Sequence, residues 1–305
     1  MAVSFSFSWL SFALLRLWDK PTKHGAELLV ASLLYFGTMG WQPLVALLLV
    51  RRWVDPSIGK PERVAPVSGR TLLVVSLLSL CLYAAATLTA QLLVAVGYLD
   101  VSTASPIRIE RPEAIDEQIR TIVFFLFAFF ATFTLVWLQA LVEEMGWRSY
   151  FLVRLREDLG PIKGLLVHGA VWGLWYAPLV LVAGQSTLPP SWTGVASFTV
   201  TAVFLGVLLG WLRLRYKSVL PPTIVNSCLT LLAGLPFIMT GVDAGARGGL
   251  YGLPGLLPLG LLALIILLRS RTRKDLNTSL QDPSAVRPSR FWIVIDGGKS
   301  NASIH

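Results

Sequence analysis

Residues 121–148 read TIVFFLFAFFATFTLVWLQALVEEMGWR, and this stretch decides the fold class. The run up to Val142 contains no charged residue, and the next two residues are Glu143 and Glu144. About 20 apolar residues, at a rise of about 1.5 Å per residue, cross roughly 30 Å of bilayer hydrocarbon. The stretch therefore predicts a membrane-spanning helix that carries two carboxyl groups at its end.

Six further apolar runs of similar length predict more spanning helices. With the first run, they lie at roughly residues 26–50, 71–97, 121–144, 162–184, 193–214, 219–240 and 250–269. The apolar opening Met1–Trp18 is shorter, and its basic residues follow the apolar part, opposite to the order in a cleaved signal peptide. We expect it to remain as an interfacial or eighth membrane segment. The predicted fold class is an all-α integral membrane protein, a bundle of seven to eight transmembrane helices.

The composition agrees with a membrane protein and argues against other classes. Of the 305 residues, 54% are hydrophobic and 14% are charged, whereas an ordinary soluble domain carries about 25% charged residues. The net charge of +9 does not indicate a nucleic-acid partner, because the basic residues lie between the apolar runs. Cys81 and Cys228 lie inside apolar runs without disulfide or metal-binding spacing, so we interpret them as small apolar residues.

Lysine and arginine positions predict the orientation of the helices. The loops after the first, third and fifth runs and the C-terminal tail hold most of these residues, and such loops are usually cytoplasmic. We therefore expect a multi-pass protein of a bacterial plasma membrane with a cytoplasmic C-terminal tail. The side of the N-terminus stays open, because Arg16, Lys20 and Lys23 favour the cytoplasm against a count of seven helices.

The charged group Glu143, Glu144 and Arg148 is the first candidate site. An ionisable side chain at membrane depth costs several kcal/mol unless it is paired or hydrated, so it is usually functional. Glu144 and Arg148 are four residues apart and share a helix face, where an ion pair is expected. Glu143 points about 100° away and is left to act as a base or a ligand. The alternative is a helix end with three solvated charges, and spacing alone weights the two equally.

Two further polar positions interrupt apolar runs. His168 shares a helix face with Trp172 and Tyr176, at spacings of four and eight residues. Its imidazole would suit a general base, a zinc ligand or, more commonly, a hydrogen bond between helices. Asn226 would aim its amide at an oxyanion or bridge two helices, and bridging is the commoner role.

Together these stretches resemble the CAAX protease and bacteriocin-processing (CPBP) family, the membrane proteins related to CAAX prenyl protease 2. EEMGWRSYFLVRL at 143–155 matches the family motif Glu-Glu-x-x-x-Arg. WGLWYAPL at 172–179 is similar to the family's W-G-L-W-H-x-P-L, and VLPPTIVNSCLT at 219–230 looks like its third stretch. The resemblance covers about residues 120–235.

The resemblance implies about eight helices around a polar cavity that opens toward the membrane and the cytosol. In the family, the first Glu activates water, while two histidines and an Asn bind water, metal or the developing oxyanion. Here the first family His falls on Tyr176, the second on Asn226 and the following Asn on Thr230. His168 lies eight residues before Tyr176, about 12 Å along the helix axis. To take the place of the family histidine, His168 would have to act with Glu143 and Asn226 from a position shifted along the helix.

The six candidate site residues are therefore Glu143, Glu144, Arg148, His168, Tyr176 and Asn226. Zinc enters through the resemblance alone, and the ligand set supports it poorly. One His with one or two carboxylates falls short of the three firm protein ligands of a usual zinc site. We assign no cofactor.

Two functions from different classes follow. The first is an endopeptidase that cuts a membrane-associated or lipidated polypeptide with a water activated by Glu143. The second is a catalytically degenerate relative that acts as a peptide-binding, immunity or assembly factor in the same cavity. A transporter ranks third, because the carboxylates cluster at one motif and do not recur in two halves. The expected partners are a membrane-associated peptide or protein and the lipid bilayer, with no nucleic acid.

This interpretation divides the chain into five parts. They are an N-terminal apolar segment at 1–25, N-terminal transmembrane helices and loops at 26–118, a motif-bearing core at 119–240, the last transmembrane helix at 241–269 and a polar tail at 270–305 that we expect to be mobile.

Overall fold

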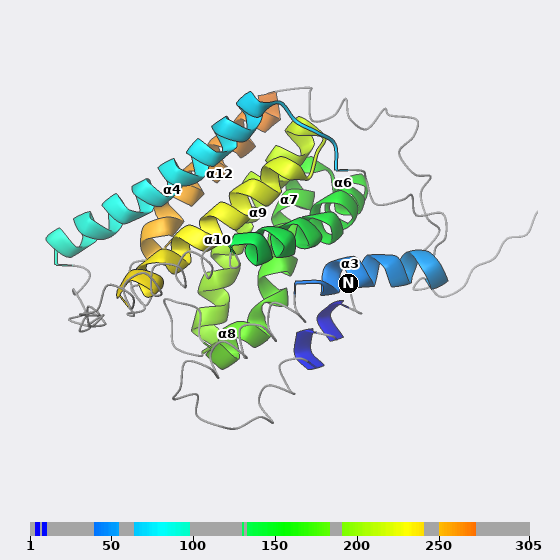
Figure 1. Ribbon diagram of the computed structural model, residues 1–305, viewed down its shortest axis with the longest axis horizontal. Coiled ribbons are helices and arrows are strands. Elements are labelled where there is room, and N and C mark those ends of the chain that lie inside the picture. The colour runs from blue at the N-terminus through cyan, green and yellow to red at the C-terminus, as the bar shows by residue number, and fades with distance from the viewer. Residues whose placement is uncertain are drawn as a thin grey trace, which may run out of the picture.

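Every regular element that the structure describes is helical (Figure 1). The computed structural model describes residues 4–6, 8–10, 40–54, 64–97, 130, 133–183, 191–240 and 250–272. The all-α prediction is confirmed for this part of the chain. Most of the predicted N-terminal segment 1–25 and nearly all of the polar tail lie outside the described residues. The total of seven to eight spanning helices therefore stays a prediction.

Within the described residues the helices follow the predicted apolar runs, and the starts of the runs 26–50 and 121–144 lie outside those residues. The loop expected after residue 144 is instead helical through residue 159. In chain order the described helices are α3 (Gln42–Leu49), the π-helix η1 (Val50–Val54), α4 (Gly69–Ala95), a helix at 133–146, the π-helix η2 (Trp147–Phe151), α6 (Leu152–Leu159), α7 (Pro161–Trp175), α8 (Ala177–Ala183), α9 (Trp192–Tyr216), α10 (Leu220–Thr240) and α12 (Leu253–Thr272).

Two of the described helices, α4 and α9, are long and apolar enough to cross a membrane. Their surroundings differ, because most of α9 is buried whereas α4 exposes large apolar side chains along its length. Leu73, Leu88 and Leu92 of α4 are 59%, 59% and 67% exposed. A continuous apolar surface of this kind suits contact with lipid better than contact with water.

Helix α9 forms the centre of the packing, against α7, α10 and α12 (Figure 1). Glycines of α7 let the two backbones approach closely. A Cβ atom at Gly169 would lie 2.6 Å from the Cα of Val203, and one at Gly173 would lie 2.7 Å from the Cα of Thr199. No side chain fits at these distances, so only glycine permits this crossing. The crossing fixes the position of α7 on α9.

The predicted run 162–184 is two helices rather than one. Helix α7 ends at Trp175 and α8 begins at Ala177. Between them the Tyr176 N–H donates to the Gly173 carbonyl at 3.1 Å, three residues back. Pro178 contributes to the break, because its nitrogen has no hydrogen to continue the α-helical ladder. Tyr176 therefore lies at a bend.

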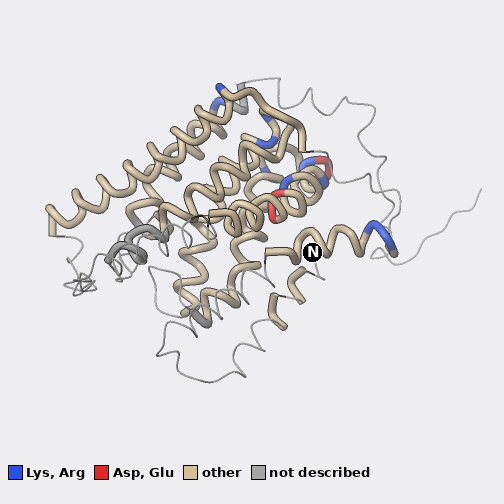
Figure 2. Tube along the Cα trace, in the orientation of Figure 1, with Lys and Arg blue, Asp and Glu red and all other residues tan. Residues whose placement is uncertain are grey.

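Charged residues are confined to parts of the bundle. Figure 2 shows lysine and arginine mainly near helix ends on one side of the molecule, while long stretches of the helices carry no charge. Two carboxylates lie in the interior, on the helix at 133–146. Because buried ionisable side chains in a membrane protein are usually functional, these two carboxylates are the first candidates for a functional site.

Candidate functional site

The adjacent residues Glu143 and Glu144 belong to two separate networks. Both are buried, with exposures of 2% and 0%. Neighbours on an α-helix point about 100° apart, so the two carboxyl groups face different neighbours. A buried carboxylate needs a charged partner or hydrogen-bond donors. Glu144 has a charged partner, and Glu143 has neutral donors.

Glu144 is held in a closed ion pair. Its Oε1 atom lies 3.0 Å from Nη1 of Arg148, and both side chains are fully buried. The Asn226 amide donates to the same oxygen at 3.2 Å. The Arg148 guanidinium lies 4.1 Å from the centroid of the Trp172 ring, in cation–π geometry. The ion pair expected from the four-residue spacing is therefore present, and its contacts with Trp172 and Asn226 join it to α7 and α10.

Glu143 is held by neutral donors instead. The Tyr176 hydroxyl donates to Glu143 Oε1 at 2.8 Å, and the Gln139 amide donates to the same oxygen at 3.1 Å. The other oxygen, Oε2, has no hydrogen-bond partner among the described residues. One oxygen of the carboxyl group is therefore held by two donors, whereas the other is buried and has none among the described residues.

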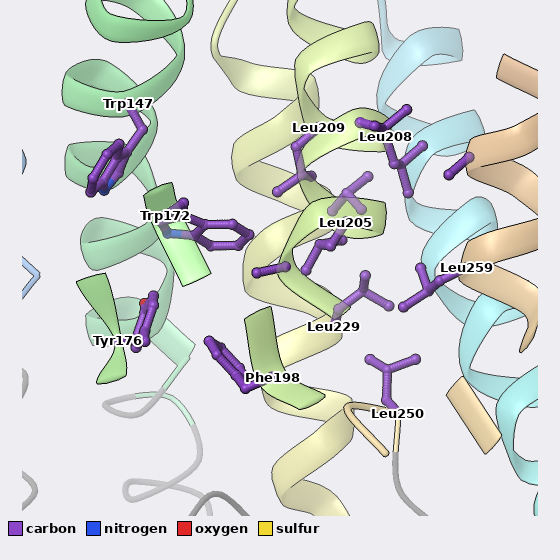
Figure 3. Close-up of a cluster of buried hydrophobic side chains, with 14 of the residues drawn as sticks. Trp147, Trp172, Tyr176, Phe198, Leu205, Leu208, Leu209, Leu229, Leu250 and Leu259 are labelled. Atoms are coloured by element: carbon purple, nitrogen blue, oxygen red, sulfur yellow. The ribbon is translucent and has the colours of Figure 1, made fainter. Parts of the chain in front are cut away.

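A cavity of about 150 Å³ lies beside this carboxyl group. Glu143, Tyr176 and Asn226 line it, whereas Glu144, Arg148 and His168 are not among the lining residues. Figure 3 shows Trp172, Tyr176 and Phe198 directed toward one another, with leucines of α9, α10 and α12 beyond them. Three of the six predicted site residues thus meet at one cavity. Glu144 and Arg148 form their ion pair outside the cavity lining.

His168 lies in a different environment. It is fully buried and packs edge-on against the Trp147 ring, with centroids 6.0 Å apart, and against the Phe151 ring at 5.9 Å. Both rings belong to η2, whose π-helical turn follows the acidic pair. The structure therefore does not bring the imidazole together with Glu143 and Asn226 at the cavity.

Other cavity residues escaped the sequence reasoning. Gln139 lies one turn before Glu143 on the same face, and a lone amide inside an apolar run was the available signal. Thr201 and Tyr251 also line the cavity, and the Thr201 hydroxyl donates to the Tyr251 carbonyl at 3.2 Å. No local pattern identifies these two, because they come from distant parts of the chain.

The residues around the cavity do not fit a zinc ion. No group of three or more His, Cys, Asp or Glu side chains that could hold a metal occurs among the described residues. Among the described residues that line the cavity, Glu143 is the one carboxylate, and the other polar side chains are amides, hydroxyls and an indole. A usual zinc site takes three firm protein ligands.

Comparisons with known proteins point to one family. Residues 123–232 match the family model described as type II CAAX prenyl endopeptidase Rce1-like. The chain is also similar to CAAX prenyl protease 2 of Methanococcus maripaludis, with 27% identity over 88 residues. That alignment covers 28% of this chain and 32% of the relative, so the chain spans about a third of the length of the curated protein it matches. The residues matched by the family model include the cavity residues from Val136 to Thr230.

Proposed function

Because this chain belongs to the CAAX protease family through residues 123–232, and is an integral membrane protein, we propose that it is an intramembrane endopeptidase. Its substrate is a membrane-associated or lipidated polypeptide, and its reaction is hydrolysis of a peptide bond by a water that Glu143 activates. The observation that carries the proposal is the different bonding of the two adjacent carboxylates. Glu144 is paired with Arg148, whereas Glu143 lines the cavity and its Oε2 atom has no hydrogen-bond partner among the described residues.

The hydrolysis follows from the groups around Glu143. The carboxylate takes a proton from water as the water oxygen bonds to the carbonyl carbon of the peptide. Glu143 then passes that proton to the amide nitrogen as the carbon–nitrogen bond breaks, which leaves a carboxylic acid and an amine. Tyr176 and Gln139 hold Glu143 Oε1, so the second oxygen is the one that meets the water. They act as positioning residues.

Asn226 supplies the donor for the developing oxyanion. Its amide nitrogen carries two hydrogens, and one of them binds Glu144 at 3.2 Å. Since Asn226 also lines the cavity, the second hydrogen is placed to bind the carbonyl oxygen of a substrate. Fixed donors of this kind contribute about 3–4 kcal/mol to the barrier of acyl transfer. Arg148 orients this donor indirectly, by pairing with Glu144.

The proposal extends to the setting of the enzyme. We place the chain in a bacterial plasma membrane with its C-terminal tail in the cytoplasm, since basic residues at helix ends usually mark the cytoplasmic face. The substrate reaches the cavity from the bilayer or its surface, where a membrane-anchored polypeptide is concentrated.

The alternative is a non-catalytic relative that binds a peptide in the same cavity. The observation that favours it is Tyr176, which stands where the family pattern has a histidine and whose hydroxyl proton is engaged with Glu143 at 2.8 Å. A phenol in that bond cannot accept a proton from water as an imidazole can. The proposed hydrolysis therefore depends on Glu143 for every proton transfer.

The replacement Glu143→Gln separates the two functions. Wild type, Glu143→Gln and the control Glu157→Gln, which alters a partly exposed carboxylate of α6, are purified in lipid. They are incubated with farnesylated CAAX peptides and a panel of membrane-anchored peptides, and products are identified by mass spectrometry. Loss of a general base lowers turnover by about 10²–10⁴-fold, so product is expected from wild type and the control but not from Glu143→Gln. Equal product from Glu143→Gln would exclude Glu143 as the general base. No product from a folded wild type that still binds the peptides would favour the non-catalytic relative.

A further inference from the structure

Ser4 and Ser8, in the dark blue segment of Figure 1, lie against the end of α7. The Ser8 hydroxyl donates to the Trp175 carbonyl at 3.0 Å, and the Trp175 indole N–H donates to the Ser4 carbonyl at 3.3 Å. Ser4, Ser8 and Trp175 are each 0% exposed. The two contacts join residues 167 and 171 positions apart in the chain. They therefore belong to the tertiary packing, and hydrogen bonds in the interior are electrostatically stronger than exposed ones.

Trp175 is the last residue of α7, directly before the bend at Tyr176. The last four carbonyls of a helix have no partner within it, and the Ser8 hydroxyl binds one of these, the carbonyl of Trp175. An indole N–H is costly to bury without an acceptor, and the Ser4 carbonyl provides that acceptor. One segment of the chain therefore fixes both the backbone and the side chain of Trp175.

Trp175 in turn contacts the tyrosine that holds Glu143. The rings of Trp175 and Tyr176 pack edge to face with centroids 4.8 Å apart, and the centroid of the Trp147 ring lies 5.5 Å from that of Trp175. The Tyr176 hydroxyl donates to Glu143 Oε1 at 2.8 Å. Because closely packed rings leave one another little room to move, a shift of Trp175 would move the Tyr176 ring and its hydroxyl.

We infer that Ser4 and Ser8 form an N-terminal clamp, which fixes Trp175 and so positions the Tyr176 hydroxyl for the proposed hydrolysis. Neither serine is among the described residues that line the cavity, and both lie outside the matched region 123–232. Ser8 is therefore a positioning residue, which acts through Tyr176 and not on the substrate. Its effect on turnover rests on the proposed function, whereas its contact with Trp175 does not.

Fluorine NMR measures the clamp without any need for catalysis. Ser8→Ala, made in the full chain, removes the hydroxyl that donates to the α7 carbonyl. The matched control is Ser79→Ala on α4, since the Ser79 hydroxyl is also 0% exposed and donates to a backbone carbonyl, that of Val75, at 3.0 Å. The protein is labelled with 3-fluorotyrosine and observed in lipid, and Tyr176→Phe identifies the Tyr176 signal among those of the seven tyrosines. Because the fluorine lies next to the hydroxyl group, its chemical shift reports the hydrogen bond to Glu143.

The Tyr176 signal should move in Ser8→Ala and keep its position in Ser79→Ala, although each variant loses one buried hydrogen bond. Turnover of a peptide that the wild type cleaves should follow the signal. In Ser8→Ala, kcat should fall at least about threefold with KM unchanged within about twofold, because the Tyr176 hydroxyl acts on the reaction and not on binding. It should not fall below the kcat of Tyr176→Phe, since the clamp acts through that hydroxyl. In Ser79→Ala both constants should stay at the wild-type values.

A double variant separates positioning from a general loss of stability. In a Tyr176→Phe background, Ser8→Ala should change kcat by less than about 1.5-fold, because the group through which it acts is already gone. An unmoved Tyr176 signal, an unchanged kcat, or equal losses of kcat in the two backgrounds overturns the inference. If the wild type cleaves no peptide, the proposed hydrolysis fails and the signal alone decides whether the clamp exists. If Ser8→Ala does not fold, Ser8→Cys, whose thiol is a weak donor, is measured in its place.

Discussion

Replacing Arg148 by alanine tests the part of the site that supports Glu143 from behind. Arg148 and Glu144 are both 0% exposed, and their nitrogen and oxygen atoms lie 3.0 Å apart. In Arg148→Ala the Glu144 carboxylate would keep the hydrogen bond from Asn226 as its contact with a donor. The contact of the guanidinium with the Trp172 ring would be lost as well.

The expected loss of stability is large. Removing one partner of a buried ion pair costs about 3–5 kcal/mol, because the remaining charge has no compensation. At about 2–4 °C per kcal/mol for a chain of roughly this size, the midpoint of thermal unfolding should fall by about 6–20 °C. The surface pair of Arg154 and Glu157, at 3.2 Å and 18% and 27% exposed, is the matched control. Arg154→Ala should cost less than about 1 kcal/mol.

Thermal unfolding in one detergent, followed by circular dichroism, measures both variants. The double variant Arg148→Ala with Glu144→Gln separates a stranded charge from a lost contact. The amide of Gln is neutral and still accepts from Asn226, so the double variant should recover most of the lost stability. An Arg148→Ala midpoint within 2 °C of the Arg154→Ala midpoint would falsify the account of a buried, compensated charge.

Three further changes probe the site and its framework. Tyr176→Phe removes the hydroxyl that donates to Glu143 at 2.8 Å; a hydrogen bond to a charged group contributes about 1.5–3 kcal/mol, so kcat in lipid should fall about 10–100-fold, and an unchanged kcat would remove Tyr176 from the mechanism. His168→Leu should keep kcat/KM within about threefold of wild type, because the imidazole lies outside the cavity lining; a folded but inactive variant would return His168 to the site. Gly169→Val brings a side chain against the α9 backbone, where even a Cβ atom would be 2.6 Å away, and should lower the free energy of unfolding by about 1–3 kcal/mol. Gly69→Val, at a position with open space around it, is the control. Equal unfolding midpoints for the two variants would contradict the close crossing.

Local patterns in the sequence predict the helices and one half of the site. The apolar runs predict the described long helices except for the break in the run 162–184, and the four-residue spacing of Glu144 and Arg148 predicts their ion pair, because both depend on neighbours along the chain. The run 162–184 is predicted as one segment, and Pro178 is the local signal for the break that the structure shows at Tyr176. The position of His168 could not be predicted, because it depends on how the π-helix η2 turns Trp147 and Phe151 toward α7.

The partners of Glu143 show why the rest of the site needs the fold. Gln139 is a neighbour on the same helix, so its contact follows from spacing alone. Tyr176 reaches the carboxylate across helices, and its position depends on the glycine contacts that seat α7 on α9. Tyr251 comes to the cavity from another turn, held by a backbone contact with Thr201 that no side-chain pattern encodes.

Two adjacent carboxylates cannot serve the same purpose on one helix, and this constraint explains the organisation of the site. Because neighbouring residues point about 100° apart, one carboxylate faces the cavity when the other faces the interior. The interior one must be neutralised, and Arg148 does this although it does not line the cavity. Asn226 joins the two sides, since it binds Glu144 and also lines the cavity. Loss of Arg148 should therefore disturb the oxyanion donor as well as the fold, and a stabilised Arg148→Ala with Glu144→Gln protein should remain less active than wild type.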